Sequence, residues 1–147
     1  MRFLSVICVL FFSPLISAAQ AKQVLPGPFP FELVEVIDGD TFRASVDIWL
    51  GQSVTVKVRL KGIDTPEMNG KCAAEKKLAR QAKVFAENWL RKNQAQLTNV
   101  HYGTYAGRVL ATAQITNGDS LSAALLAENL AKLLSPRRLK FPFSAPQ

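Results

Sequence analysis

The chain has 147 residues, of which 48% are hydrophobic and 20% are charged, and its formal net charge at pH 7 is +7. This length leaves room for one compact domain with an ordinary globular core and for little else. The basic excess can attract polyanions such as nucleic acids, although charge alone does not distinguish such a protein from a merely soluble basic one.

Residues 1–21 are expected to form a secretory signal peptide. Arg2 precedes an apolar run that ends in small residues, a pattern typical of cleavage after Ala19 or Ala21. The alternative is an uncleaved membrane anchor, which the short run and Pro14 disfavour. We therefore expect a secreted or periplasmic protein with no stable membrane association after cleavage.

The domain proper is expected over residues 31–134, after a proline-rich linker at residues 22–30. The first strand is predicted from Phe31 to Ile37, and it ends in a turn that carries Gly39 and Asp40. Gly39 is expected to supply the backbone freedom that a tight carboxylate turn needs.

The next two strands alternate apolar and polar residues, as half-buried strands do. The apolar faces are predicted to contain Phe42, Ala44, Val46 and Ile48 in one strand and Val54, Val56, Val58 and Leu60 in the other. This alternation places Arg59 on the face opposite the core, where it can reach a cleft.

A second turn with carboxylates, Asp64-Thr65-Pro66-Glu67, follows Arg59 by five residues. Asp-Gly and Thr-Pro are common turn dipeptides whose acids often bond only to local backbone, so one such turn is a weak signal. Two of them with an arginine between are a stronger one. Together they predict that Asp40, Asp64 and Glu67 meet beside Arg59, as in a site for a hard cation and a phosphate.

A helix is predicted from about Ala73 to Lys92, with Leu78, Ala82, Phe85 and Trp89 as its buried stripe. Cys8 would leave with the signal peptide, so the mature chain cannot form an internal disulfide. Cys72 is expected to be a small packed residue near the helix start, with reactivity or pairing between chains as the alternative.

The rest of the domain is predicted to contain two strands and a short helix, at Gln96–Tyr102, Arg108–Thr116 and Leu121–Glu128. Asp119 or Ser120 can cap this helix, and Asn129 is a plausible left-handed stop. His101 is assigned no catalytic role. The basic tail at 135–147 contains too many breakers for a long helix and is expected to be mobile.

These blocks resemble the staphylococcal nuclease (thermonuclease) family. The resemblance rests on Asp-Gly-Asp-Thr at 38–41, on Arg59 followed by Asp-Thr-Pro-Glu at 64–67, and on the turn at 105–108, and it covers about Phe31 to Leu134. It implies an α+β, mainly β fold: a five-stranded Greek-key barrel of the oligonucleotide-binding (OB-fold) type with two or three packed helices. It also implies calcium-dependent cleavage of phosphodiester bonds in DNA and RNA, and we expect a monomer.

The resemblance also implies roles for single residues. Asp40 and Asp64 resemble the side-chain ligands of calcium, and Thr65 would offer its backbone carbonyl to the same ion. Glu67 resembles the residue that activates the attacking water. The expected cofactor is therefore Ca²⁺, held entirely by oxygen ligands.

Arg59 and Arg108 resemble the two residues that hold the scissile phosphate. The turn before Arg108 departs from the family pattern, because Ala106 is an extra residue between Tyr105 and Gly107. Ser135 stands near a position where some members have a tyrosine. These departures weaken the expected grip on substrate more than they affect the chemistry.

Two functions from different classes remain open. The first is a secreted, calcium-dependent nuclease of loose sequence preference. The alternative is a catalytically weak or inactive OB-fold module that binds nucleic acid without cutting it. The complete set of acids favours the enzyme, because a binding module has little use for a carboxylate such as Glu67, which repels phosphate.

Overall fold

The computed structural model describes residues 23–70, 72–103 and 107–134. The expected signal peptide, Tyr105, the inserted Ala106 and the basic tail lie outside these described residues. Among the residues that are described, no helix is long and apolar enough to cross a membrane.

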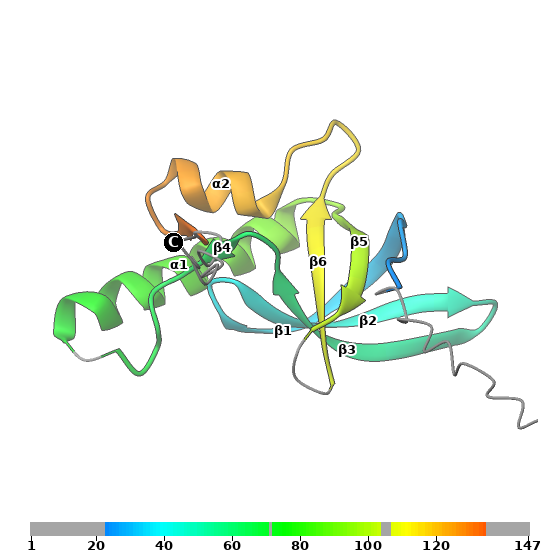
Figure 1. The fold of residues 1–147 in the computed structure, drawn as a ribbon, viewed down its shortest axis with the longest axis horizontal. Helices are drawn as coiled ribbons and strands as arrows, with labels where there is room; N and C mark the ends of the chain where they lie inside the picture. The colour runs from blue at the N-terminus through cyan, green and yellow to red at the C-terminus, as the bar shows by residue number, and fades with distance from the viewer. Residues whose placement is uncertain (1–22, 71, 104–106, 135–147) are drawn as a thin grey trace, which may run out of the picture.

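Five strands close a barrel in the order β1-β2-β3-β6-β5 (Figure 1). Neighbouring strands are antiparallel except for β3 and β6, which are parallel. Their bounds are β1 Phe29–Asp38, β2 Thr41–Trp49, β3 Gln52–Leu60, β5 Gln96–Tyr102 and β6 Arg108–Gln114. A closed, mixed barrel with two helices confirms the predicted fold class. The first strand begins two residues earlier than expected, and β6 ends two residues earlier.

The barrel core follows the alternation of β2 and β3. Phe42, Ala44, Val58 and Leu60 are buried, as predicted. The prediction is wrong at the far end of this hairpin, where Ile48 and Val54 are 55% and 40% exposed. Figure 1 shows the reason, because the β2–β3 hairpin extends beyond the barrel on the side away from the helices.

Helix α1 (Ala73–Lys92) has the predicted bounds and packs against β1. Its fully buried residues are Ala79, Ala82, Ala86 and Leu90, whereas Leu78 is 37% exposed and Phe85 and Trp89 are half-buried. The predicted stripe is confirmed at Ala82, holds in part at Phe85 and Trp89, which pack against the core, and was wrong at Leu78. Small side chains let the helix lie close to the barrel, so the larger apolar residues are displaced to the edges of the contact.

Cys72 is the N-cap of α1, and its Sγ accepts a hydrogen bond from the backbone N–H of Glu75 at 3.4 Å. The side chain is exposed, so the expectation of a packed cysteine was wrong. The helix start needs an acceptor for its free N–H groups, and this need places the thiol at the surface.

Helix α2 (Leu121–Ala127) follows β6, and the Ser120 hydroxyl caps it by accepting from the N–H of Ala123 at 3.2 Å. The chain then turns through Asn129, whose φ is +56°, as expected for a left-handed stop. After this turn, β7 (Lys132–Leu133) pairs with β4 (Ile63–Asp64). This small sheet, which the sequence did not predict, ties the end of the domain to the second carboxylate turn.

Candidate active site

The turn between β1 and β2 holds Asp40 in a buried position. Its side chain is enclosed by polar donors: Oδ1 accepts from the Thr41 hydroxyl at 2.8 Å, and Oδ2 accepts from the backbone N–H of Thr65 at 3.1 Å. The residue is only 1% exposed. Two segments far apart in the sequence are therefore joined through one carboxylate.

Gly39 keeps this turn close to α1. Its φ is not in the left-handed region, so the predicted need for backbone freedom was wrong. A Cβ at this position would lie 2.7 Å from the Cβ of Ala82 and 2.9 Å from Cγ2 of Thr65, closer than packed carbons approach. Glycine is required here because a helix and the second carboxylate turn both press on the first turn.

Arg59 joins the two carboxylate turns. One Nη of its guanidinium donates to Oδ1 of Asp40, and the other donates to Oδ1 of Asp64 at 2.9 Å. The Arg59 side chain is 20% exposed and that of Asp64 is 32% exposed, so this cluster opens to solvent on the Asp64 side. Of the three acids predicted to meet beside Arg59, Asp40 and Asp64 do so, whereas no contact between Glu67 and Arg59 occurs among the described bonds.

The electrostatics of Asp40 reflect its burial. Desolvation raises the pKa of its carboxyl group from 3.8 to about 6, and the nearby Asp38 charge acts in the same direction. The Arg59 guanidinium and the Thr41 hydroxyl oppose this shift and lower the pKa. Asp40 is thus a carboxylate whose charge is costly unless cations stand close to it.

Glu67 lies on the second turn, and its side chain is exposed. It lines a pocket of about 270 Å³ together with Asp64, and two residues that sequence reasoning did not assign, Glu75 and Lys132, line the same pocket. Glu67 therefore shares a cavity with two of the three predicted ligands, Asp64 and Thr65, whereas Asp40 does not line it.

Lys132 enters this site through the β4–β7 pair, in which it is the direct partner of Asp64. Its Nζ lies 3.8 Å from Oδ2 of Asp64, on an exposed side chain. No local pattern could have indicated this contact, because a two-residue strand has no periodicity to detect. Asp64 is consequently held between two cations, Arg59 and Lys132.

Arg108 opens β6 and is the register partner of Lys57, two residues before Arg59 on the neighbouring strand β3. Its side chain is half-buried and lies against Gly103. The fold therefore brings Arg108 to the strand beside Arg59.

The donor set suits a hard divalent cation. Asp40 and Asp64 come from separate turns, and both accept hydrogen bonds from the guanidinium of Arg59. The two carboxylates therefore already lie close together. No group of three or more His, Cys, Asp or Glu side chains that could hold a metal occurs in the part of the chain that the structure describes. A bound ion would thus need two carboxylates, a carbonyl such as that of Thr65, and water, which the irregular shells of calcium allow.

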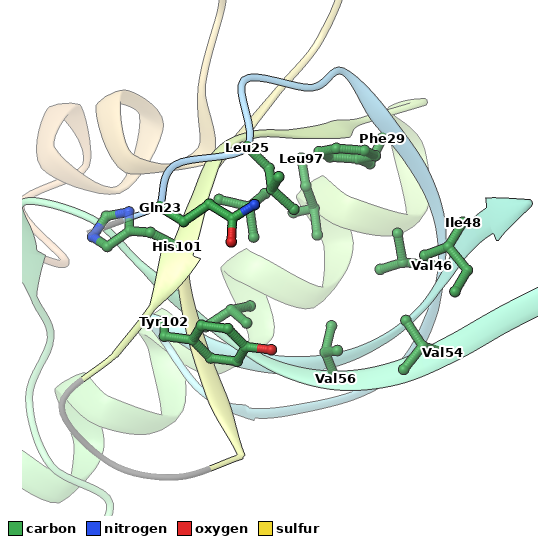
Figure 2. Close-up of a pocket in the computed structure, with 12 residues that line it drawn as sticks. Gln23, Leu25, Phe29, Val46, Ile48, Val54, Val56, Leu97, His101 and Tyr102 are labelled. Carbon is green, nitrogen blue, oxygen red and sulfur yellow. The ribbon is translucent and has the colours of Figure 1, made fainter. Parts of the chain in front are cut away.

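A separate cavity of about 300 Å³ lies at the open end of the barrel (Figure 2). Figure 2 shows a mostly aliphatic lining together with Phe29, and Gln23, His101 and Tyr102 on one side. None of the predicted site residues lines it, and neither does any carboxylate. Hydrolysis needs groups that hold charge, so this apolar cavity is not a candidate for the chemistry.

A family model described as staphylococcal nuclease homologue matches residues 57–141, more than half of the chain. The matched segment includes Arg59, the second carboxylate turn and Arg108, whereas Asp40 precedes it. A search of curated proteins finds no match. With the barrel, the paired turns and this match together, the chain belongs to the staphylococcal nuclease family.

Proposed function

We propose that the protein is a calcium-dependent phosphodiesterase that hydrolyses DNA, RNA or both with loose sequence preference. Membership of the staphylococcal nuclease family indicates nucleic-acid binding and nuclease-type hydrolysis. The observation that carries the proposal is the convergence of Asp40 and Asp64 on the two Nη atoms of Arg59. A phosphodiester needs such a combination, because both its anionic oxygens and its leaving oxygen require neutralisation.

Asp40, Asp64 and the backbone carbonyl of Thr65 are the groups that would hold calcium. The ion, when bound, would polarise the phosphoryl group and orient a water molecule. The protein contributes a buried carboxylate in Asp40, already surrounded by donors, and a more accessible one in Asp64. These two environments favour a site with one fixed side and one side open to substrate.

Arg59 and Arg108 would bind the phosphate. The guanidinium is planar and permanently charged, so it can donate two parallel hydrogen bonds to phosphate oxygens that gain charge during the reaction. In this structure both Nη atoms of Arg59 donate to carboxylates, those of Asp40 and Asp64. It would exchange at least one of them for phosphate once the carboxylates are neutralised by a cation.

Glu67 would accept the proton of the attacking water. Its position at the pocket that Asp64 also lines leaves room for water and a phosphate oxygen between them. A general base must first be within reach of the proton it takes, and the exposed carboxylate of Glu67 meets that condition better than buried Asp40. No covalent nucleophile is required.

We further propose that the protein acts as a monomer after export, either secreted or periplasmic. The sequence pattern of residues 1–21 supports export, and the basic charge supports attraction of nucleic acid.

The test is incubation of the protein from residue 22 onward with plasmid DNA and with RNA, in calcium and in excess chelator. Cleavage in calcium that stops on chelation is the expected result, and Asp40→Asn should behave as the chelated parent does. Full activity in chelator would refute the metal assignment. A folded parent that binds nucleic acid in calcium but never cuts it would favour the binding module.

A further inference from the structure

Three basic side chains lie in one row across the outer face of the barrel. Arg43 on β2 is the register partner of Lys57 on β3, and Lys57 is in turn the partner of Arg108 on β6. The neighbours of Arg43 and Lys57 along their strands point inward, Phe42 and Val58 being buried. Strand alternation therefore directs this cationic row, Arg43, Lys57 and Arg108, to the outside.

Arg43 at one end of the row has an acidic partner, whereas Lys57 in its middle has none among the described residues. Arg43 contacts Glu35 at 2.8 Å, at the end of the row on β1. Lys57 is half-buried and makes no ion pair with any residue that the structure describes. Like charges on directly opposed strand positions destabilise a sheet, so an anion over Lys57 would relieve its repulsion with the arginines on either side.

The row adjoins the candidate active site. Lys57 and Arg59 are two residues apart on β3 and share a face, which separates their Cα atoms by about 6.6 Å. Arg59 contacts both carboxylates of the site. An anionic chain whose scissile phosphate is held by Arg59 and Arg108 therefore meets Lys57 next, and then Arg43 on β2.

We propose that the cationic row carries the nucleic-acid backbone away from the cleavage site, with Lys57 binding the phosphate next to the one at Arg59. The identity of the ligand rests on the proposed function. The contacts are to phosphates only, since the row contains no aromatic or amide side chain that could recognise a base. It would thus position the substrate without selecting a sequence, and the nucleic-acid strand would run from the site at β6 and β3 onto β2.

The experiment measures the affinity for a short, labelled single-stranded DNA by fluorescence anisotropy, in chelator, over a series of salt concentrations. Loss of one phosphate contact lowers the slope of log affinity against log salt by about 0.7 for a single strand. We expect this reduction and weaker binding for Lys57→Gln, and restoration of the slope by Lys57→Arg. The melting temperature of Lys57→Gln without DNA should equal or exceed that of the parent.

Lys92→Gln is the matched control. Lys92 is an exposed lysine in the last turn of α1, also without an ion pair among the described residues. The next strand begins at Gln96, whose partner Gln114 is at the opposite end of β6 from Arg108. The slope of log affinity against log salt for Lys92→Gln should therefore equal that of the parent.

A salt slope for Lys57→Gln equal to that of the parent would overturn the proposal. An equal reduction of the slope in Lys92→Gln would also overturn it, because binding would then depend on the overall positive charge of the protein and not on the cationic row. Failure of the proposed hydrolysis is distinguishable. If the parent never cuts DNA but Lys57→Gln has the reduced slope, phosphate binding by the row is supported and the proposed hydrolysis is refuted. If the parent cuts DNA and the slope for Lys57→Gln equals that of the parent, the proposed hydrolysis is supported and phosphate binding by the row is refuted.

Discussion

Arg59 is the residue on which the candidate site depends most, because its two Nη atoms contact carboxylates from two different turns. It has a structural task in neutralising buried Asp40 and a proposed chemical task in binding phosphate. Arg108 instead begins the neighbouring strand β6 and lies against Gly103. The two arginines should therefore respond differently to the same substitution.

We predict that Arg59→Lys lowers both stability and turnover, whereas Arg108→Lys lowers mainly turnover. A lysine cannot bridge Asp40 and Asp64, so we expect a loss of about 2 kcal/mol in the free energy of unfolding. Loss of one aligned donor typically lowers the rate by roughly a hundredfold. Urea unfolding and steady-state kinetics on both variants provide the comparison.

A different pattern would change the assignments. If Arg108→Lys kept the turnover of the parent, the altered turn before it has removed that arginine from the reaction. If Arg59→Lys were as stable as the parent, its contact with Asp40 would not hold the two turns together.

Glu67 and Glu75 line the same pocket, so they form a natural pair for testing the general base. We predict that Glu67→Gln lowers turnover by about a hundredfold to ten-thousandfold, because the amide cannot accept the proton of water. Calcium and oligonucleotide affinity should persist, since size and hydrogen bonding are largely kept. Turnover, calorimetric calcium binding and DNA anisotropy are the three measurements.

Glu75→Gln is the control for this prediction, because Glu75 belongs to the first turn of α1 and not to the carboxylate turn. Turnover of Glu67→Gln within a few-fold of the parent would rule out Glu67 as the base. A larger loss in Glu75→Gln than in Glu67→Gln would transfer that role to Glu75.

At the scale of elements, the first carboxylate turn is positioned by α1 through close packing. Gly39 lies where a side chain would collide with Ala82 and Thr65, and Ala82 belongs to the small-residue stripe of the helix. The helix is thus part of the site's support even though it contributes no residue to the Arg59 contacts.

We predict that Gly39→Ala destabilises the domain by about 1–3 kcal/mol, the usual consequence of overpacking, and lowers turnover by displacing Asp40. Adding Ala82→Gly removes the closer of the two collisions and should recover part of both losses, despite about 1 kcal/mol lost for a glycine inside a helix. Thermal unfolding and plasmid cleavage on the single and double variants measure this. Losses that simply add would show that the turn and helix are not in contact as described.

At the scale of the whole molecule, the raised pKa of Asp40 connects stability to pH. The folded chain holds this proton more tightly than the unfolded chain does, with pKa values of about 6 and 3.8. The resulting stability is fully present below about pH 4 and is lost as the pH rises through about 6, a change of about 3 kcal/mol. Calcium requires the deprotonated carboxylate, so calcium affinity should rise over the same range.

We predict that the melting temperature in chelator falls between pH 4 and pH 7 and that calcium restores it at pH 7, because a ligand of the folded state stabilises that state. Asp40→Asn should show neither the fall nor the recovery. Melting curves at a series of pH values, with calcium and with chelator, measure both. If the melting temperature depended on pH equally in the parent and in Asp40→Asn, Asp40 would not be the cause of that dependence.

Much of the fold and of the candidate site could be predicted from the sequence where the determining pattern is local. The alternation in β2 and β3 predicted their inward faces near the site, and the bounds of α1 followed from its helical pattern. The position of Arg59 opposite the core followed from the same alternation. Burial patterns within one element depend on the spacing of side chains along it, which the sequence contains directly.

The tertiary structure alone decided what depends on which faces meet. The parallel pairing of β3 with β6 aligns Lys57 with Arg108, and the β4–β7 pair brings Lys132 to Asp64. The close approach of α1 selected alanines over Phe85 and Trp89 for its buried face and made Gly39 a packing position. These contacts join segments far apart in the chain, and their partners are chosen by packing of the whole barrel, which no local pattern encodes.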